Sequence, residues 1–449
     1  MQWAVRLRIR GLGCCSDLLS RVHSGLAGGH LVFFPSLRFE NLPEGFRRLS
    51  RPLITVFAVE DTALQCTWAA LPAPQVHLEI GDRTLDVAAG PQAVLHMARR
   101  PPRPLQARGG FGGPGAVTVD GLSPSTTYEV LVSGPGIPRQ VVTEVTTLPA
   151  PPGAALLRLA TLNDLHIGEG VFGMLGTMED PSPLPAHREP FAMGAARAAI
   201  AEAVAWGAEA LVVKGDMTRR SEDAEFHAVG RLLATSPIPV LAVLGNHDVH
   251  RGSDGPSILA GHGLEAASGP VARDLPGLRV VLGYSPSPTT KRGIIEPRQR
   301  RQVAELVAGA PQGAMVVFHH QPDGRLASRC YPPGIDRRVA LSLLDAVAAA
   351  NPATLVTSGH THRHRLRRHG PLVITETGSP RDYPGTWTGY AVSEGGIRQV
   401  VRRIAAPEVI GWTEASGLAM GGIWRRWSPG ALAARCFTHP WPVRPGRPA

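Results

Sequence analysis

Lysine and cysteine are scarce in this chain of 449 residues. Only Lys214 and Lys291 are lysines, so arginine supplies nearly all of the positive charge. The five cysteines are odd in number and show no C-x-x-C spacing. This pattern does not indicate a disulfide framework or a zinc knuckle, and we expect a reduced, cytoplasmic protein.

Long apolar runs are also missing. No stretch reaches the roughly 18 apolar residues that a membrane-spanning helix requires. The basic start of the chain is not followed by the unbroken apolar segment of a signal peptide, so we expect no membrane association. Hydrophobic residues still make up 43% of the sequence, which is enough for the cores of two or three domains.

The formal net charge of +10 is concentrated at the two ends of the chain. Residues 1–52 carry eight arginines against three acidic residues, and residues 398–449 carry eight against two. The remaining residues 53–397 hold 30 basic and 31 acidic groups, a net charge of −1. Because a neutral centre does not suit a polyanion, nucleic acid is not the expected partner. The sequence does not indicate an oligomeric state.

Composition divides the chain into four parts. Residues 1–55 are basic and turn-rich, as is typical of a disordered extension, and residues 406–449 form a tail rich in tryptophan and arginine. Residues 56–150 hold short alternating runs between glycines and prolines, which predict a small all-β sandwich. Residues 154–405 alternate apolar strands with helical segments, an α/β pattern. The proline-rich segment 149–153 predicts a stiff linker between them.

Five apolar runs in the α/β part are predicted strands, and each is followed by a polar motif. The runs are 155–162, 210–214, 239–244, 314–318 and 353–358, and the motifs are "NDLH", "GDMT", "GNHD", "HHQP" and "GHTH". Helices are predicted at 191–207, 297–310 and 336–351, with Asp336 as an N-cap. Each motif alone is weak. Together, at the strand ends where α/β folds bind ligands, they predict one metal site.

In this order the motifs resemble those of the calcineurin-like metallophosphoesterases: D-x-H, G-D, G-N-H-[DE], a single strand-end histidine and G-H-x-H. The resemblance covers about residues 155–405. It implies a four-layer αββα fold, in which two mixed sheets lie face to face between layers of helices. Ahead of it, "GLSPSTTYEVLVSG" resembles a fibronectin type III strand pair, with Leu122 and Tyr128 at the positions of its buried leucine and corner tyrosine.

The resemblance implies two divalent metal ions bridged by Asp216. Its motifs assign the other ligands as Asp164, His166 and His362 for one ion, and Asn246, His319 and His360 for the second. Nitrogen and oxygen donors of this kind suit Mn, Fe, Zn or Co, of which we expect Mn or Fe. His320 is an alternative to His319, but we expect His319 to be the ligand and His320 to lie at the rim, because the family histidine usually ends the strand.

The family mechanism implies that a hydroxide held between the metals attacks phosphorus. His247 would then donate a proton or a hydrogen bond to the leaving oxygen, and Asp248 would orient His247. Possible contacts to substrate are Arg219, His320 and Arg363. From Arg363 onward the chain predicts an exposed hairpin.

The substrate class is inferred from the residues that make up the motifs. Purple acid phosphatases also carry a sandwich domain of this kind, but their ferric ion binds a tyrosine three residues after the bridging aspartate, and here that residue is Arg219. The motifs are closer to class III cyclic nucleotide phosphodiesterases, which implies a small phosphodiester or cyclic nucleotide as substrate. A nuclease, a phosphomonoesterase or a noncatalytic scaffold remain alternatives. Residues 167–190 and 251–275 are the loops expected to set selectivity, and 167–190 would be either a lid or a solvated loop.

Overall fold

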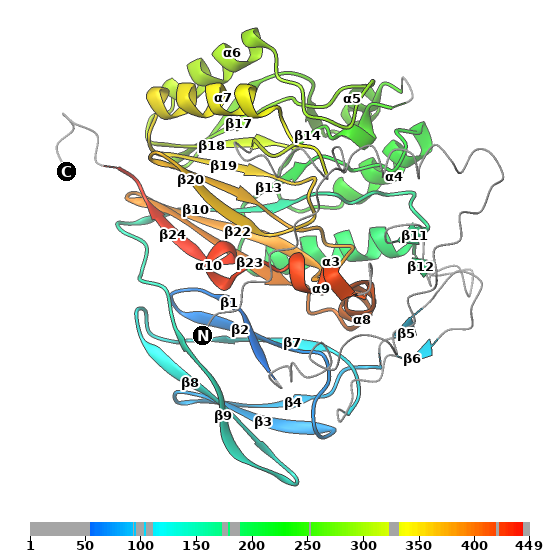
Figure 1. Ribbon diagram of the computed structural model, residues 1–449, viewed down its shortest axis with the longest axis vertical. Coiled ribbons are helices and arrows are strands. Elements are labelled where there is room, and N and C mark those ends of the chain that lie inside the picture. Colours follow the sequence, from blue (N-terminus) through cyan, green and yellow to red (C-terminus); the bar gives the residue numbers. More distant parts are fainter. Residues whose placement is uncertain are drawn as a thin grey trace, which may run out of the picture.

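The computed structural model of this chain describes most of the residues after 53 (Figure 1). The described ranges are 54–92, 94–95, 103–104, 111–172, 178–179, 189–250, 253–322, 332–418 and 422–442. The predicted extension 1–55 therefore lies almost wholly outside the described residues, as does most of the predicted loop 167–190. Among the described residues, no helix combines the length and apolarity needed to cross a membrane.

The first part of the fold is a β-sandwich of two antiparallel sheets. One sheet has the order β1-β2-β7, with β1 (Thr55–Val59), β2 (Ala63–Trp68) and β7 (Gly115–Asp120). The other has the order β4-β3-β8-β9, with β3 (Gln75–Ile80), β4 (Arg83–Ala88), β8 (Thr127–Gly134) and β9 (Ile137–Thr146). A separate two-stranded ribbon pairs β5 (Val94–Leu95) with β6 (Arg103–Pro104). The alternation of apolar and polar residues explains strands such as β3, in which Val76, Leu78 and Ile80 are all buried in the core.

The α/β part contains two large sheets. The seven-stranded sheet has the order β15-β14-β13-β10-β22-β23-β24. Its strands are β10 (Ala155–Leu162), β13 (Ala210–Lys214), β14 (Val240–Val243), β15 (Glu265–Ala267), β22 (Thr386–Ser393), β23 (Gly396–Arg403) and β24 (Phe437–Pro440). The six-stranded sheet has the order β16-β17-β18-β19-β21-β20. Its strands are β16 (Val271–Leu275), β17 (Leu278–Leu282), β18 (Gly313–Phe318), β19 (Thr354–Ser358), β20 (Arg365–His369) and β21 (Leu372–Glu376). The short strands β11 (Val171–Phe172) and β12 (Met178–Glu179) pair separately.

Helices cover the outer face of each sheet. The helices α3 (Phe191–Ala205), α4 (Asp223–Leu233) and α5 (Gly255–Gly261) pack on the seven-stranded sheet. The helices α6 (Pro297–Ala308) and α7 (Arg337–Ala350) pack on the six-stranded sheet (Figure 1). As predicted, Asp336 caps α7, and its carboxylate accepts from Arg338 N at 2.9 Å. These four layers confirm the predicted αββα fold.

The apolar strand runs are continuous because both faces of these strands are buried. In β13, Leu211 and Val213 pack toward the helices, while Ala210 and Val212 pack toward the six-stranded sheet. The selectivity loop predicted at 251–275 is not irregular throughout, since it contains α5, β15 and β16.

The described residues after 406 are part of the α/β layers. They form α8 (Pro407–Ser416), α9 (Ile423–Trp427), α10 (Leu432–Arg435) and β24. Strand β24 pairs antiparallel with β23, which would otherwise be an exposed edge. Trp441 packs against the cluster between the two large sheets. The segment that we expected to be a tail therefore completes a sheet.

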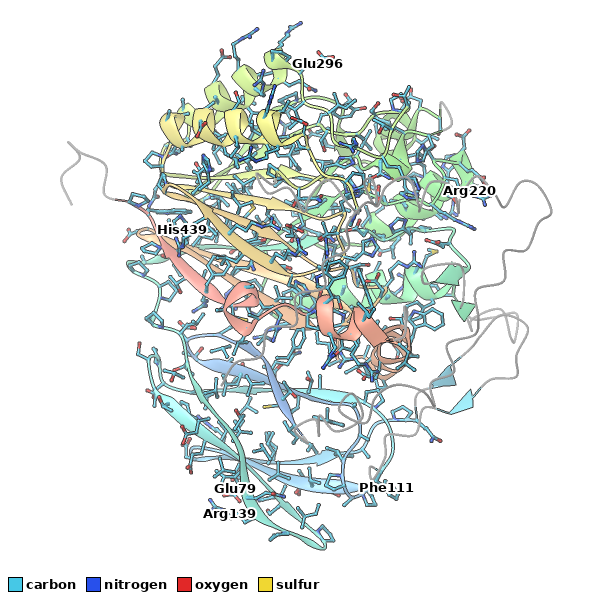
Figure 2. All side chains as sticks on the ribbon, viewed as in Figure 1. Glu79, Phe111, Arg139, Arg220, Glu296 and His439 are labelled. Carbon is cyan, nitrogen blue, oxygen red and sulfur yellow. The ribbon has the colours of Figure 1, made fainter. Side chains whose placement is uncertain are left out.

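The β-sandwich docks onto the strands β22 and β23 and onto α3, and one hydrophobic cluster spans the junction. Glu60 accepts from Arg402 Nε at 3.0 Å and from Trp206 Nε1 at 3.2 Å. At the far end of the sandwich, Arg139 and Glu79 form an exposed ion pair (Figure 2).

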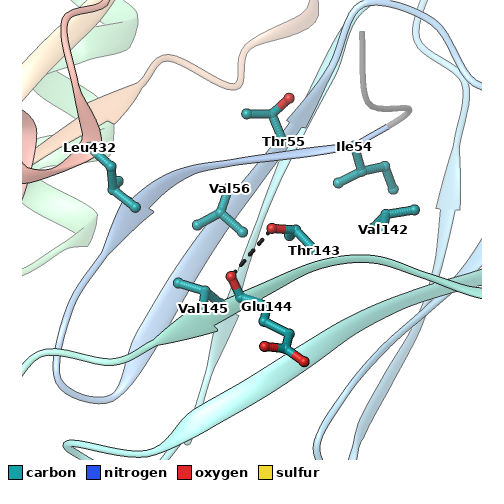
Figure 3. Close-up of a pocket in the computed structure, with 8 residues that line it drawn as sticks. All are labelled: Ile54, Thr55, Val56, Val142, Thr143, Glu144, Val145 and Leu432. Atoms are coloured by element: carbon teal, nitrogen blue, oxygen red, sulfur yellow. Dashed lines mark hydrogen bonds between the residues drawn. The ribbon is translucent and has the colours of Figure 1, made fainter. Parts of the chain in front are cut away.

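A pocket of about 170 Å³ lies between the sandwich and α10 (Figure 3). Its lining residues are Ile54, Thr55, Val56, Val142, Thr143, Glu144, Val145 and Leu432. None of them is a predicted site residue, so this pocket is separate from the site described below.

Candidate metal centre

The five strand-end motifs meet where the two large sheets face each other. Strands β10, β13 and β14 bring three motifs from the seven-stranded sheet, while β18 and β19 bring two from the six-stranded sheet. The structure thus brings all seven predicted ligands together. All are buried apart from His362, whose side chain is 19% exposed.

The seven side chains form two groups that meet at Asp216. In the first, Asp164, His166 and His362 place one donor atom each within 4.8 Å of the others. In the second, His319 Nε2 lies 3.2 Å from Asn246 Oδ1 and 3.2 Å from His360 Nδ1.

Asp216 lies between the two groups. Its Oδ2 is 3.3 Å from His319 Nε2 and 3.7 Å from His166 Nε2. One carboxylate oxygen therefore faces a histidine of each group, as a bridging position requires.

The donor atoms around His319 fit a cation. His319 Nδ1 lies 2.9 Å from the carbonyl of Lys214, which only accepts, so Nδ1 carries the hydrogen. In the neutral ring, Nε2 then presents a lone pair toward the oxygens of Asp216 and Asn246. Burial lowers the pKa of His319, but the Asp216 and Asp164 carboxylates and the Lys214 carbonyl together raise it to about 9. A proton or a metal ion satisfies this arrangement, and imidazole, amide and carboxylate donors fit a divalent ion.

Backbone strain is concentrated at this centre. Among the described residues, seven non-glycine residues have a positive φ, and five of them are predicted ligands: Asp164, His166, Asp216, His360 and His362. Aspartate and histidine tolerate this region better than most residues, at a cost of about 1–3 kcal/mol each. Strain of this kind persists where surrounding contacts hold the residue, and it clusters at functional sites.

Two glycines of the motifs are required by close approach. A Cβ on Gly245 would lie 2.2 Å from Asp216 Oδ1. Gly215 has φ +83°, and a Cβ there would lie 2.7 Å from the backbone nitrogen of Gly245. The glycines that begin "GDMT" and "GNHD" therefore allow the two loops to pack against each other.

His247 lies beside this centre and is half-buried. Its backbone N–H donates to Asp216 Oδ1 at 2.8 Å, and its Nδ1 lies 2.7 Å from the carbonyl of Arg219. Its ring centroid is 4.7 Å from that of His166. One ring nitrogen each of His247 and His166 and a carboxylate oxygen of Asp216 lie within 4.8 Å of one another, which is close enough to hold one ion. The assignment of His247 as a non-ligand therefore stays a prediction.

Asp248 does not orient His247 in the way that we expected. Its carboxylate accepts from the backbone of Gly245, Met217 and Thr218 and from the Thr218 hydroxyl, at 2.8 to 3.2 Å. Burial and the neighbouring Asp216 raise the pKa of Asp248 to about 6, against the effect of these hydrogen bonds. Asp248 therefore ties two motif loops together, and the carbonyl of Arg219 orients the His247 ring.

Two of the three expected substrate contacts lie deeper than predicted. His320 is fully buried instead of lying at the rim, with its ring nitrogens 2.9 Å from Ser285 Oγ and 3.2 Å from the carbonyl of Lys291. Arg363 is also buried, and its guanidinium lies 4.2 Å from the ring centroid of Trp427. Arg219 is half-buried, and its backbone carbonyl contacts His247 Nδ1.

Several residues that support the ligands were not identified from the sequence. Asn163 Nδ2 donates to Asp164 Oδ2 at 2.5 Å, and Lys214 Nζ donates to Thr357 Oγ1 and to the carbonyl of Ser358, both at 3.1 Å. Burial lowers the pKa of Lys214 to about 7. Lys214 could have been identified from the sequence, because it ends an apolar strand in a chain with only two lysines.

A further supporting residue is Asp382, whose Oδ2 lies 2.6 Å from His362 Nδ1. Burial lowers the pKa of His362, but Asp382 and Asp164 together raise it well above its usual value. Nothing in the local sequence "SPRDYPG" indicated this contact.

The chain is similar to one protein family and to several solved structures. A family model described as calcineurin-like phosphoesterase matches residues 157–364. Similar solved structures include a purple acid phosphatase from yellow lupin (Lupinus luteus) seeds, 11% identical, which covers 78% of this chain and 72% of its own with a TM-score of 0.39. PhoD is 9% identical over 77% of this chain and 85% of its own, with a TM-score of 0.35. Phosphopantetheinyl hydrolase from Mycobacterium tuberculosis is 14% identical over 51% and 91%, with a TM-score of 0.29.

No curated protein sequence matches the chain. The family match covers the stretch that carries all five motifs, and the four-layer fold agrees with it. Residues 157–364, somewhat less than half of this chain, therefore match the calcineurin-like phosphoesterase family.

Proposed function

We propose that this protein is a phosphodiesterase with two divalent metal ions, acting on a small phosphodiester or a cyclic nucleotide. The observation that carries the proposal is the position of Asp216 between two groups of buried donor atoms. A single carboxylate shared by two such groups is the arrangement that two-metal hydrolysis requires.

In this proposal, Asp164, His166 and His362 hold one ion, and Asn246, His319 and His360 hold the other. Two bound ions would supply an activated water as nucleophile and would take up negative charge on the nonbridging phosphoryl oxygens. The mixture of imidazole nitrogens and carboxylate oxygens favours Mn or Fe.

His247 is the proposed proton donor. Its Nδ1–H donates to the carbonyl of Arg219, which fixes the ring and leaves Nε2 for the substrate. As an imidazolium, it can donate from Nε2 to the leaving oxygen. The hydrogen bond from its backbone to Asp216 Oδ1 keeps this ring at a fixed position relative to the bridging carboxylate.

The preference for diesters rests on the motifs. Arg219 occupies the position where a purple acid phosphatase has its tyrosine ligand, so a ferric-tyrosinate monoesterase is disfavoured. The net charge of −1 over residues 53–397 disfavours a nuclease.

The test is a substrate panel on the full chain loaded with Mn. We expect a higher kcat/KM for bis-p-nitrophenyl phosphate and for a cyclic nucleotide than for p-nitrophenyl phosphate. The Asp216→Asn variant controls for contaminating activity. Preference for the monoester contradicts the proposal, and efficient cleavage of single-stranded DNA identifies a nuclease instead.

A further inference from the structure

One loop outside the family match contacts one histidine of a donor group and lies near the other histidine through Glu169. The loop spans residues 379–384 and follows β21, whereas the match ends at residue 364. We infer that Arg381 and Asp382 are positioning residues for the ion site formed by Asp164, His166 and His362, and for that site alone. This inference rests on the proposed function, because it assumes two ion sites.

Asp382 acts directly on His362. Its Oδ2 lies 2.6 Å from Nδ1, and Asp382 is only 3% exposed. A carboxylate at this distance accepts the Nδ1 hydrogen, so Nε2 keeps the lone pair. That Nε2 atom lies 3.3 Å from Asp164 Oδ1, on the side where the ion would bind. Asp382 therefore sets the tautomer and the ring orientation that coordination needs.

Arg381 lies near His166 on the far side of Glu169. Its Nη1 donates to Glu169 Oε2 at 2.5 Å, and the same oxygen lies 3.8 Å from His166 Nδ1, which is a charge contact and too long for a hydrogen bond. Arg381 is almost fully buried, which strengthens its interaction with the carboxylate. Asp382 thus fixes one ligand by a hydrogen bond, and Arg381 adds a charge contact near a second ligand from a distant strand end.

Helix α8 holds this loop in place. Trp412 Nε1 donates to the carbonyl of Arg381 at 3.1 Å, and the backbone N–H of Tyr383 donates to Ser416 Oγ at 2.8 Å. On its other side, Ser379 Oγ donates to the carbonyl of Asp164 at 2.8 Å. Helix α8 is therefore connected to the first ion site through the loop.

In the second donor group, His319 is positioned by a residue outside this loop. His319 Nδ1 is held by the carbonyl of Lys214 in β13, inside the matched region. A change in the loop should therefore weaken one ion site and spare the other. General structural damage would weaken both sites together.

The test measures Mn²⁺ binding to the metal-stripped full chain by calorimetry, with metal content as a second readout. For Asp382→Asn we expect one of two sites to weaken by about 10- to 100-fold, the usual effect of losing such a partner, while the other keeps its affinity. Asp382→Glu should restore part of the loss. Trp412→Phe, which removes the N–H donated to Arg381 and reduces the ring that packs against Phe191, should weaken the same site to a smaller extent.

Glu60→Gln is the matched control, since it neutralises a buried carboxylate at the junction with the sandwich that is not one of the proposed ligands, and it should bind two ions normally. Equal weakening of both sites in Asp382→Asn, or no weakening, overturns the inference. A wild-type chain that binds two ions but hydrolyses no phosphodiester contradicts the proposed function and leaves this inference intact. A wild-type chain that binds fewer than two ions contradicts both.

Discussion

Gln65 of the β-sandwich and Arg403 of the α/β domain exchange two hydrogen bonds. Gln65 Nε2 donates to the carbonyl of Arg403 at 2.8 Å, and the backbone N–H of Arg403 donates to Gln65 Oε1 at 2.8 Å. Both residues are buried, so the amide side chain satisfies a peptide group that water does not reach. The sandwich is therefore fixed against β23.

Gln65→Leu should destabilise the folded chain. It leaves the buried N–H and C=O of Arg403 without these partners, at about 1–3 kcal/mol for each group. We expect the urea unfolding midpoint to fall accordingly. Gln140→Leu, at an exposed position on β9, is the control and should change the free energy of unfolding by less than about 0.5 kcal/mol. Equal stability of both variants would contradict this account of the junction.

His319 and His320 can be distinguished by metal binding. His319→Ala removes a proposed ligand and should reduce the metal content from two ions per chain to one. His320→Ala removes the hydrogen bonds to Ser285 and to the carbonyl of Lys291, so it should lower stability but retain two ions. Metal content per folded chain is the measurement. The opposite result would make His320 the ligand.

His247→Ala should separate metal binding from turnover. The variant keeps both proposed ion sites but loses the proton donor, so kcat should fall by about 10²- to 10⁴-fold. The loss should be smaller with p-nitrophenolate as the leaving group, because that group leaves without a proton. Asp216→Ala should lose both metal and turnover. Unchanged kcat in His247→Ala, or loss of a metal ion, rules out this role.

His439 on β24 should make the fold sensitive to acid. Burial, followed by the charge of Arg368, lowers the pKa of His439 to about 4. Between pH 6.5 and 4 the unfolded chain therefore binds a proton that the folded chain does not, and the free energy of unfolding falls as the pH is lowered.

The measurement is urea unfolding at several pH values. In His439→Asn, which does not titrate, the fall between pH 6.5 and 4 should be smaller than in the wild type. Identical pH profiles of the two proteins would show that His439 contributes nothing to acid sensitivity.

The strands of the metal centre and most of the residues at their ends could be predicted from the amino-acid sequence. The predicted runs 155–162 and 210–214 coincide with β10 and β13, because strands buried on both faces are written as continuous apolar runs. The N-cap of α7 at Asp336 could likewise be predicted, because a cap is a local interaction.

The contacts between groups from distant segments could not be predicted in this way, because they depend on the tertiary structure. It placed β18 and β19 in a different sheet from β10, put Arg363 beneath Trp427, and gave the orientation of His247 to the Arg219 carbonyl. It also brought Asp382 to His362 across 20 residues of chain. Periodicity and motif spacing record local conformation, whereas these contacts depend on how two sheets, a loop and a C-terminal helix pack together.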